Sequence, residues 1–386
     1  MTVHLGKDRM RVILVTRNFP PLVGGMETLL FEAYRALKEQ FDVALIGPSG
    51  SGDFIEPDSR TLSIAHSPLS RFLLHAQWES IKLAIRFRPQ LVLAGSGLAA
   101  PAAFFAARAV AAKVACFVHG LDLVVDNLLY RKVFLPTIVK SDCLIANSRN
   151  TADLAASAGA VSDRVSVLRP GVAMPLEAQT RTRFRERLGL SERPILLSVG
   201  RLTPRKGVYE FVRHALPSVV ARRPDAVLVV IGDDPKDAVK SSSRQQQRIL
   251  EAARECGVSD HVRLLGRVDN TTLSDAYAAA DVFLFPAIEV PGDVEGYGMV
   301  ALEAAAHGVA TVAFSVGGIS DAVKDGVSGY LVPPGDYEQF VEVLLRHINA
   351  DNREEWSLRC RTYAESLGWD RYGQELTRIL NALVAC

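Results

Sequence analysis

The sequence predicts an α/β fold with two doubly wound parallel sheets, and three observations lead to this prediction. Short apolar runs alternate along the whole chain with longer amphipathic segments, a pattern typical of β–α repeats. The runs lack polar alternation, as expected for parallel strands that helices cover on both faces. The chain has 386 residues, too many for one compact core, and it holds more runs than the eight or so strands of a barrel.

The predicted elements follow one another without a long irregular stretch. The predicted strands are Val12–Val15, Val43–Ile46, Leu91–Ala94, Val114–Val118, Cys143–Ala146, Val165–Leu168, Ile195–Val199, Val227–Ile231, Val262–Leu265, Val282–Phe285 and Val309–Ala313. The predicted helices between them include 27–39, 99–112, 149–158, 207–221, 271–280 and 298–307. A domain break is expected within 175–194, where two prolines flank a charged segment just before a new strand.

The distribution of charge supports this division into two domains. Residues 1–190 carry 23 Lys and Arg against 16 Asp and Glu, whereas residues 191–386 carry 21 against 27. The formal net charge of the whole chain is only +1, which argues against a nucleic-acid partner. A basic front half and an acidic back half suggest domains that face different partners.

The cysteines and the start of the chain bear on its location. There are five cysteines, an odd number with no C-x-x-C pair, and Cys116 and Cys143 lie inside apolar runs. We therefore expect buried free thiols and a reducing compartment. We expect no signal peptide and no membrane span, because charged residues precede a short apolar run and no later stretch offers about 20 uninterrupted apolar residues. The predicted location is the cytoplasm.

The first candidate motif is the segment 20–27 (PPLVGGME), between the first predicted strand and the first predicted helix. Gly24 and Gly25 would let the backbone approach a ligand closely, and the helix N-terminus would present N–H groups to an anion. The alternative is a plain tight turn. The segment is not a dinucleotide fingerprint, because G-x-G-x-x-G is absent.

The second motif is the segment 200–207 (GRLTPRKG), directly after the first strand of the second domain. Arg201 and Lys206 could converge on a diphosphate at the carboxyl end of the sheet, where open α/β folds bind ligands. The alternative is a solvated basic loop. The segment does not match the phosphate-binding pattern G-x-x-x-x-G-K-[ST].

The third motif is the segment 293–303 (DVEGYGMVALE), which carries Glu295 in a glycine-rich loop and Glu303 on the helix that follows. A glutamate flanked by Ala and Leu is costly to bury unless something pairs with it. A ribose diol, which donates two hydrogen bonds, would suit Glu303. The alternative is a helix-capping carboxylate plus one ion pair in the core.

Taken together, these motifs resemble the retaining GT-B glycosyltransferases of family four. The resemblance covers most of the chain and includes further pieces, namely His119-Gly120, Asn147-Ser148, Arg169-Pro170-Gly171-Val172 and Gly317-Gly318. The stretch 291–303 is similar in particular to bacterial GDP-mannose-dependent mannosyltransferases that modify lipid acceptors. The chain departs from the family after Gly-Gly, where Asp321 replaces a frequent Glu. Asp122 stands where an acidic residue commonly follows His-Gly.

The resemblance implies two facing Rossmann-like domains. Residues 1–185 would bind the acceptor and residues 186–368 the nucleotide sugar, and the helix 369–386 would pack back on the first domain.

The resemblance also implies roles for individual residues. Arg201 and Lys206 would hold the donor diphosphate. Glu295 would hold the sugar hydroxyls and Glu303 the ribose, while His119 would lie over the transferring sugar. The other substrate-binding positions that it implies are Gly24, Gly25, Val268, Gly298, Met299 and Val300.

The expected activity is transfer of a hexose, with retention, from a GDP- or UDP-sugar to a hydroxyl of a glycan or lipid-linked acceptor. The resemblance leans toward GDP-mannose as donor and toward cell-envelope or exopolysaccharide synthesis. No D-x-D motif occurs, so a metal that bridges the diphosphate is not expected. No other cofactor is expected. The main alternative is a UDP-sugar 2-epimerase of the same fold. An NAD-dependent oxidoreductase and an inactive binding protein are weaker alternatives.

The segment 70–88 predicts an amphipathic helix in the basic half of the chain. Four basic residues alternate there with apolar ones, Phe72, Leu73, Leu74, Trp78 and Phe87. Such a helix could lie on anionic lipid, which would make the protein peripheral on the inner face of the cell membrane. The alternative is an ordinary helix that packs on a core.

Overall fold

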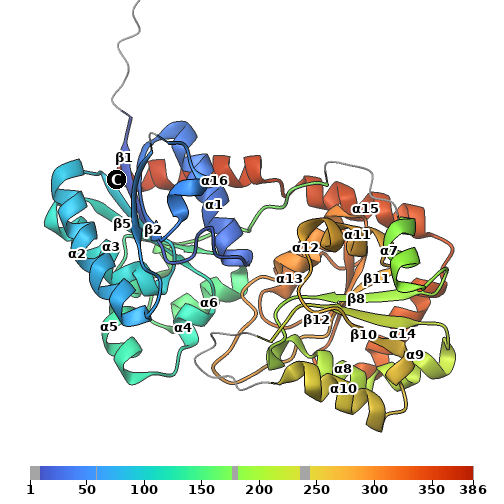
Figure 1. The fold of residues 1–386 in the computed structure, drawn as a ribbon. Coiled ribbons are helices and arrows are strands. Elements are labelled where there is room, and N and C mark those ends of the chain that lie inside the picture. The colour runs from blue at the N-terminus through green and yellow to red at the C-terminus, as the bar shows by residue number, and fades with distance from the viewer. Residues whose placement is uncertain (1–8, 58, 176–180, 235–243, 386) are drawn as a thin grey trace, which may run out of the picture. The chain divides into compact units, whose positions relative to one another are not determined.

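The computed structural model describes residues 9–57, 59–175, 181–234 and 244–385, which form two compact units (Figure 1). Unit 1 runs to Gly171 and resumes at Trp369, and unit 2 spans Val172–Gly368. The predicted boundary between residues 185 and 186 falls inside α7 (Arg181–Leu188), whose Phe184 is buried in the core of unit 2. The division therefore lies earlier in the chain, just after Gly171.

Unit 1 contains a seven-stranded parallel sheet in the order β3-β2-β1-β4-β5-β6-β7. The strands are β1 (Arg11–Val15), β2 (Asp42–Pro48), β3 (Arg60–Ile64), β4 (Leu91–Ala94), β5 (Lys113–Val118), β6 (Cys143–Ala146) and β7 (Val165–Val167). The chain winds from β1 to one edge and from β4 to the other, so the predicted doubly wound sheet is confirmed. The carboxyl ends of β1 and β4 form its topological switch point, where such sheets bind ligands.

Helices cover both faces of this sheet (Figure 1). The helices α1 (Gly25–Gln40) and α16 (Trp369–Ala385) bury apolar side chains against one face. The opposite face is covered by α2 (Leu69–Phe87), α3 (Ala100–Ala109), α5 (Leu128–Val139) and α6 (Arg149–Ser157). A short helix, α4 (Leu121–Val124), follows β5. The last helix of the chain therefore belongs to unit 1.

Unit 2 contains a six-stranded parallel sheet in the order β10-β9-β8-β11-β12-β13. Its strands are β8 (Ile195–Val199), β9 (Val227–Ile231), β10 (Val262–Leu264), β11 (Val282–Phe285), β12 (Thr311–Phe314) and β13 (Gly329–Val332). Its helices, besides α7, are α8 (Val208–His214), α9 (Leu216–Arg222), α10 (Gln245–Glu255), α11 (Asn270–Ala279), α12 (Met299–Ala306), α13 (Ile319–Ala322), α14 (Tyr337–Asn349) and α15 (Arg353–Glu365). The switch point of this sheet lies between β8 and β11.

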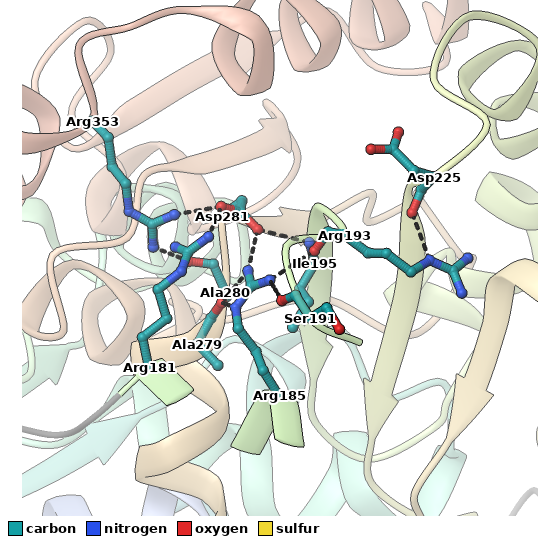
Figure 2. Close-up of polar contacts among 10 residues, drawn as sticks. All are labelled: Arg181, Arg185, Ser191, Arg193, Ile195, Asp225, Ala279, Ala280, Asp281 and Arg353. Carbon is teal, nitrogen blue, oxygen red and sulfur yellow. Dashed lines mark hydrogen bonds and ion pairs between the residues drawn. The ribbon is translucent and has the colours of Figure 1, made fainter. Parts of the chain in front are cut away.

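The amino end of the second sheet is held by one aspartate and three arginines (Figure 2). Asp281 accepts hydrogen bonds from Arg181, Arg185, Arg353 and the backbone N–H of Ile195, the last at 2.8 Å. Arg185 is only 4% exposed, and it also donates to backbone carbonyl oxygens of Ala279, Ser191 and Arg193. Burial lowers the pKa of Arg185, but Asp281 opposes that effect, so the buried guanidinium keeps its partner. The cluster fixes α7 and α15 to the start of β8 and β11.

The two segments that connect the units are closely packed within their own units. The Val172 N–H donates to the Leu367 carbonyl at 3.0 Å, so the first and last residues of unit 2 are neighbours. In unit 1, a Cβ at Gly171 would lie 2.7 Å from the Trp369 ring. The absence of a side chain at Gly171 therefore allows the start of α16 to pack against the end of the first segment.

The structure corrects the predicted apolar face of the segment 70–88. Phe72 and Phe87 are buried in the core of unit 1 and do not face solvent. Leu74 and Trp78 are 72% and 61% exposed, and Ile85 is 51% exposed on the same outward side of α2. The helix thus packs on the core with one face and keeps an apolar stripe outside.

The cysteines and the helices agree with two further expectations. Cys116 and Cys143 are buried free thiols, whereas Cys386 lies outside the described residues. Among the helices of the described ranges, none combines the length and the apolar character that crossing a membrane requires.

Candidate active site

Two of the predicted motifs meet at the switch point of unit 2, where the carboxyl ends of β8 and β11 lie side by side. Lys206 ends a 3-10 turn (Pro204–Lys206) after β8, and Glu295 lies in the loop that follows β11. The Lys206 Nζ is 2.8 Å from Glu295 Oε2. The predicted cation and the predicted carboxylate are thus brought together as a direct ion pair.

Arg205 joins this pair, and the sequence did not single it out. Its Nε lies 3.2 Å from Glu295 Oε2, and its Nη1 lies 3.1 Å from Asp293 Oδ2. Arg205 therefore bridges the two carboxylates of the loop after β11. The result is a cluster of two cations and two carboxylates, defined here as the Arg205–Glu295 cluster: Arg205, Lys206, Asp293 and Glu295.

Burial and pairing oppose each other within the Arg205–Glu295 cluster. Glu295 is only 9% exposed, and burial alone would raise its pKa. Lys206 and Arg205 outweigh burial and hold the pKa of Glu295 below its usual value, so the carboxylate is ionised. Burial lowers the pKa of the Lys206 ammonium, and Glu295 limits that fall. Lys206 also lies 4.5 Å from the centre of the Phe285 ring, a cation–π contact.

The loops after β8 and β11 are joined by their backbones. The Ile288 N–H donates to the Arg205 carbonyl at 2.9 Å. Gly207 follows Lys206 with a φ of 67°, and a Cβ there would collide with the Pro286 carbonyl oxygen. Glycine at 207 therefore permits the close approach that positions Lys206 beside Glu295.

Glu303 lies on the second turn of α12, half-buried and bonded to a tyrosine. The Tyr277 hydroxyl donates to Glu303 Oε2 at 2.9 Å, and Tyr277 stacks on His307. Burial raises the pKa of Glu303, while the Tyr277 hydrogen bond acts in the opposite direction. The Glu303 Oε1 atom is free of any such bond among the described residues, so one carboxylate oxygen is available to a ligand.

The start of α12 lies between Glu295 and Glu303 in the sequence. Gly298 caps this helix with a φ of 95°, and a Cβ there would lie 2.7 Å from the Phe285 ring. Met299 and Val300 form the first turn, whose N–H groups have no partner inside the helix. These N–H groups can donate to an anion, as the resemblance implies.

The other predicted residues of this set are more scattered. Arg201 is exposed at the beginning of the loop after β8. Val268 is half-buried beyond β10 and packs against the core of unit 2. Gly24 and Gly25 lie in unit 1, where Gly24 caps α1 at the switch point of the first sheet.

His119 directly follows β5 of unit 1 and is 7% exposed. Its Nε2 lies 2.9 Å from the Gly95 carbonyl oxygen, an acceptor, so Nε2 carries the proton in the neutral ring. Within the described part of the chain, Nδ1 has no partner and is left as a hydrogen-bond acceptor. Asp122 accepts from the backbone N–H groups of His119 and Gly97 and so fixes this corner of the sheet.

Sequence reasoning missed Arg205, Asp293 and Tyr277. The first two stand next to predicted residues, and the opposite charges in the segments 200–207 and 293–303 were a usable signal for their pairing. Tyr277 offered no such signal, because a tyrosine in an amphipathic helix is normally a core residue. Only the fold places it beside Glu303.

Two protein-family models match this chain, one mainly in unit 1 and the other in unit 2. Residues 23–174 match the family model described as "Glycosyltransferase Family 4", and residues 180–366 match "Glycosyl transferases group 1". A GDP-mannose-dependent alpha-(1-6)-phosphatidylinositol monomannoside mannosyltransferase of Mycolicibacterium smegmatis is 30% identical over 85% of this chain and 86% of its own length. The chain belongs to glycosyltransferase family 4.

Further family 4 relatives and solved structures agree. The protein of the same description from Mycobacterium tuberculosis is 31% identical over 83% of this chain and 85% of its own. The Anabaena HepE structure with UDP covers 97% of this chain and 100% of its own at a TM-score of 0.78, with 18% identity. Sucrose-phosphate synthase from Thermosynechococcus elongatus covers 98% and 100% at a TM-score of 0.79, with 21% identity. The predicted GT-B fold class is confirmed.

Proposed function

We propose that this family 4 glycosyltransferase transfers a hexose from a nucleotide-diphosphate sugar to a hydroxyl acceptor, with retention of the anomeric configuration. The observation that carries the proposal is the Lys206–Glu295 pair at 2.8 Å, at the switch point of the second sheet. A cation for the diphosphate and a carboxylate for sugar hydroxyls are the two groups that a nucleotide sugar requires side by side.

Each residue then acts at a different part of the donor. Arg201 and Lys206 hold the diphosphate and stabilise the charge that develops on it as the glycosidic bond breaks. The N–H groups at the start of α12 add to this stabilisation. Glu303 accepts hydrogen bonds from the ribose, and Glu295 accepts from the sugar hydroxyls. The leaving phosphate takes the proton of the acceptor on the face from which it departs.

Arg205 gives the Arg205–Glu295 cluster a second cation. When the Lys206 ammonium turns toward the diphosphate, Arg205 still neutralises Glu295 at 3.2 Å. The carboxylate then stays ionised in a buried site, where an unpaired charge would be costly. Glu295 acts as a hydrogen-bond acceptor in this proposal and not as a nucleophile.

GDP-mannose is the proposed donor, because the relatives at 30–31% identity are described as GDP-mannose-dependent. UDP-sugars are the second candidate, since the related HepE structure holds UDP. The proposed acceptor is a glycan or a lipid-linked glycan of the cell envelope, in line with the phosphatidylinositol mannoside acceptors named for those relatives.

Thermal unfolding with GDP, UDP, ADP and their sugars tests the donor. A ligand that binds only the native state raises the melting temperature, by an amount that increases with its concentration relative to Kd. We expect GDP and GDP-mannose to give the largest shift. A response to none of the nucleotides would refute the proposed donor site.

Incubation with the donor alone separates transfer from epimerisation. A 2-epimerase makes a new sugar nucleotide without acceptor, whereas the proposed transferase yields only slow hydrolysis until a hydroxyl acceptor is added. Accumulation of an epimeric sugar nucleotide would favour the alternative enzyme.

We also propose that α2 contacts anionic lipid from the inner side of the cell membrane. Its outward stripe of Leu74, Trp78 and Ile85 is exposed, and the basic Arg86 and Arg88 are exposed beside it. Each basic residue near an anionic surface adds about 1 kcal/mol of binding free energy. Sedimentation with anionic vesicles should therefore fall at high salt and in Arg86→Glu/Arg88→Glu. Equal binding to neutral and anionic vesicles, or binding to neither, would refute this contact.

A further inference from the structure

A second region of unit 1 gathers basic side chains far from the switch point. A cavity of about 740 Å³ opens at the amino ends of β1, β2 and β3. Gly24 and His119 lie at the other end of the strands, the carboxyl end. The last turns of α1 and α2 complete its wall. The charged side chains that line it are Arg9, Arg11, Lys38, Arg60, Arg86 and Asp42.

The charges in this cavity do not balance. Five cations face one lining carboxylate, and one further carboxylate, that of Glu56, lies 3.8 Å from the Lys38 ammonium. The C-terminal ends of α1 and α2 contribute about half a negative charge each. An excess of about two positive charges remains after these terms. Like charges held together destabilise a fold unless an anion compensates them.

The cations are not equivalent. Arg60 already has a partner, since its Nη1 is 2.7 Å from Asp42 Oδ2 and its guanidinium lies 5.0 Å from the centre of the Phe87 ring. In the described part of the chain, no carboxylate is bonded to Arg9, Arg11 or Arg86. These three guanidinium groups are the ones available to a ligand.

We propose that this cavity binds a phosphate-bearing anion at a site separate from the donor diphosphate. Arginine presents planar pairs of N–H donors that match phosphate oxygens, and a phosphate ester can accept from several arginines at once. The buried rings of Phe41 and Phe87 form an apolar part of the wall, which strengthens charged hydrogen bonds by excluding water. The ligand is either a soluble phosphate compound or the headgroup of an anionic phospholipid.

Arg11→Glu tests the site without touching α2 or any residue of the candidate active site. Arg254→Glu is the matched control, because it makes the same charge change at an exposed position of α10 in unit 2. Arg11→Gln removes the charge with a smaller perturbation and serves if Arg11→Glu fails to fold. The soluble probe is inorganic pyrophosphate, titrated by calorimetry into the full chain.

We expect pyrophosphate to show a binding event that Lys206→Ala and Arg254→Glu retain and that Arg11→Glu weakens at least tenfold. Vesicles of phosphatidylglycerol, with phosphatidylcholine vesicles as the neutral reference, form the second arm. A loss confined to phosphatidylglycerol binding identifies a lipid headgroup as the source, and a loss of pyrophosphate binding identifies a soluble compound. If Arg11→Glu and Arg11→Gln both bind pyrophosphate and phosphatidylglycerol as the wild type does, the proposal is wrong.

Discussion

Glutamine at 303 should weaken the binding of nucleotide diphosphate, and the structure indicates why. The Tyr277 hydroxyl donates to one oxygen of Glu303 at 2.9 Å. In Glu303→Gln the single amide oxygen must accept that bond, which turns the NH2 group toward the position of the free carboxylate oxygen. A ribose hydroxyl that donates there would meet another donor. Loss of one hydrogen bond to a charged group costs roughly 1.5–3 kcal/mol, which weakens binding by ~10–150-fold.

Glu295→Gln should affect the sugar donor and not the free nucleotide, although Glu295 and Glu303 lie in one motif. Glu295→Gln removes the charge that neutralises Lys206, and Arg205 keeps only Asp293. Breaking a buried ion pair costs about 3–5 kcal/mol of stability, and the low end applies because Asp293 remains. The affinity for nucleotide diphosphate should stay nearly unchanged, since the cations at the diphosphate are intact. The kcat/KM for the sugar donor should fall.

Calorimetry with GDP and UDP on both variants, together with kinetics on the sugar donor, measures these effects. Glu289→Gln is the matched control, because Glu289 is exposed in the same loop after β11. Glu303→Gln should weaken the nucleotide and the intact donor by similar factors. If Glu295→Gln weakens the nucleotide as much as Glu303→Gln does, the roles assigned to the two carboxylates are wrong.

Four further predictions concern the diphosphate site, the need for a metal, the role of Tyr277 and the stability that Asp281 provides. Lys206→Ala and Arg201→Ala should each lower kcat ~10²–10³-fold at saturating donor with the fold intact, and activity within about threefold of wild type for both would contradict the diphosphate site. Turnover should persist in excess EDTA, whereas a loss that Mg²⁺ or Mn²⁺ restores would show that a metal is needed. Burial already raises the pKa of Glu303, and Tyr277→Phe should raise it further because the hydrogen bond to the carboxylate is lost. As the pH is lowered, nucleotide binding should therefore weaken at a higher pH in this variant than in the wild type. An unchanged pH profile of Kd would show that Tyr277 does not act on Glu303. Asp281→Asn should lower the free energy of unfolding by about 3–5 kcal/mol, because Arg185 would stay buried without its counter-charge. Asp225→Asn is the control, because it affects a surface ion pair and should lower the free energy of unfolding by about 1 kcal/mol or less. Equal shifts of the melting temperature for both variants would refute the role assigned to Asp281.

The apolar runs predicted the strands in the middle of each sheet because those strands are buried on both faces. The strands β3 and β13 were not predicted, and both lie at sheet edges, although the other two edge strands, β7 and β10, were predicted. The β3 sequence RTLSI buries fully only its last residue, Ile64. An edge strand needs no continuous apolar run, so composition alone cannot distinguish it from a loop. The helix α2 shows the same limit, since the sequence could not tell that Phe72 faces the core while Trp78 faces out.

The sequence indicated some of the residues that gather at the switch point of unit 2, but not the contacts between them. Glycine-rich loops after apolar runs located Lys206, Glu295 and Glu303, since the carboxyl ends of neighbouring parallel strands meet. Pairwise contacts depend on how the loops close, which rests on local backbone geometry such as the approach of Gly207 to Pro286. Opposite charges in the two segments indicated a pairing, but only the structure shows that Arg205 bridges two carboxylates.

The hydrogen bond between Val172 and Leu367 has a consequence for protein engineering. Unit 2 is one continuous segment of the chain, and its first and last residues are neighbours, so the chain enters and leaves this unit at one place. Unit 1 is interrupted there and is completed by α16. Unit 2 of a relative can thus be exchanged at these two junctions with only two peptide joins, and unit 2 is suited to circular permutation through a short linker.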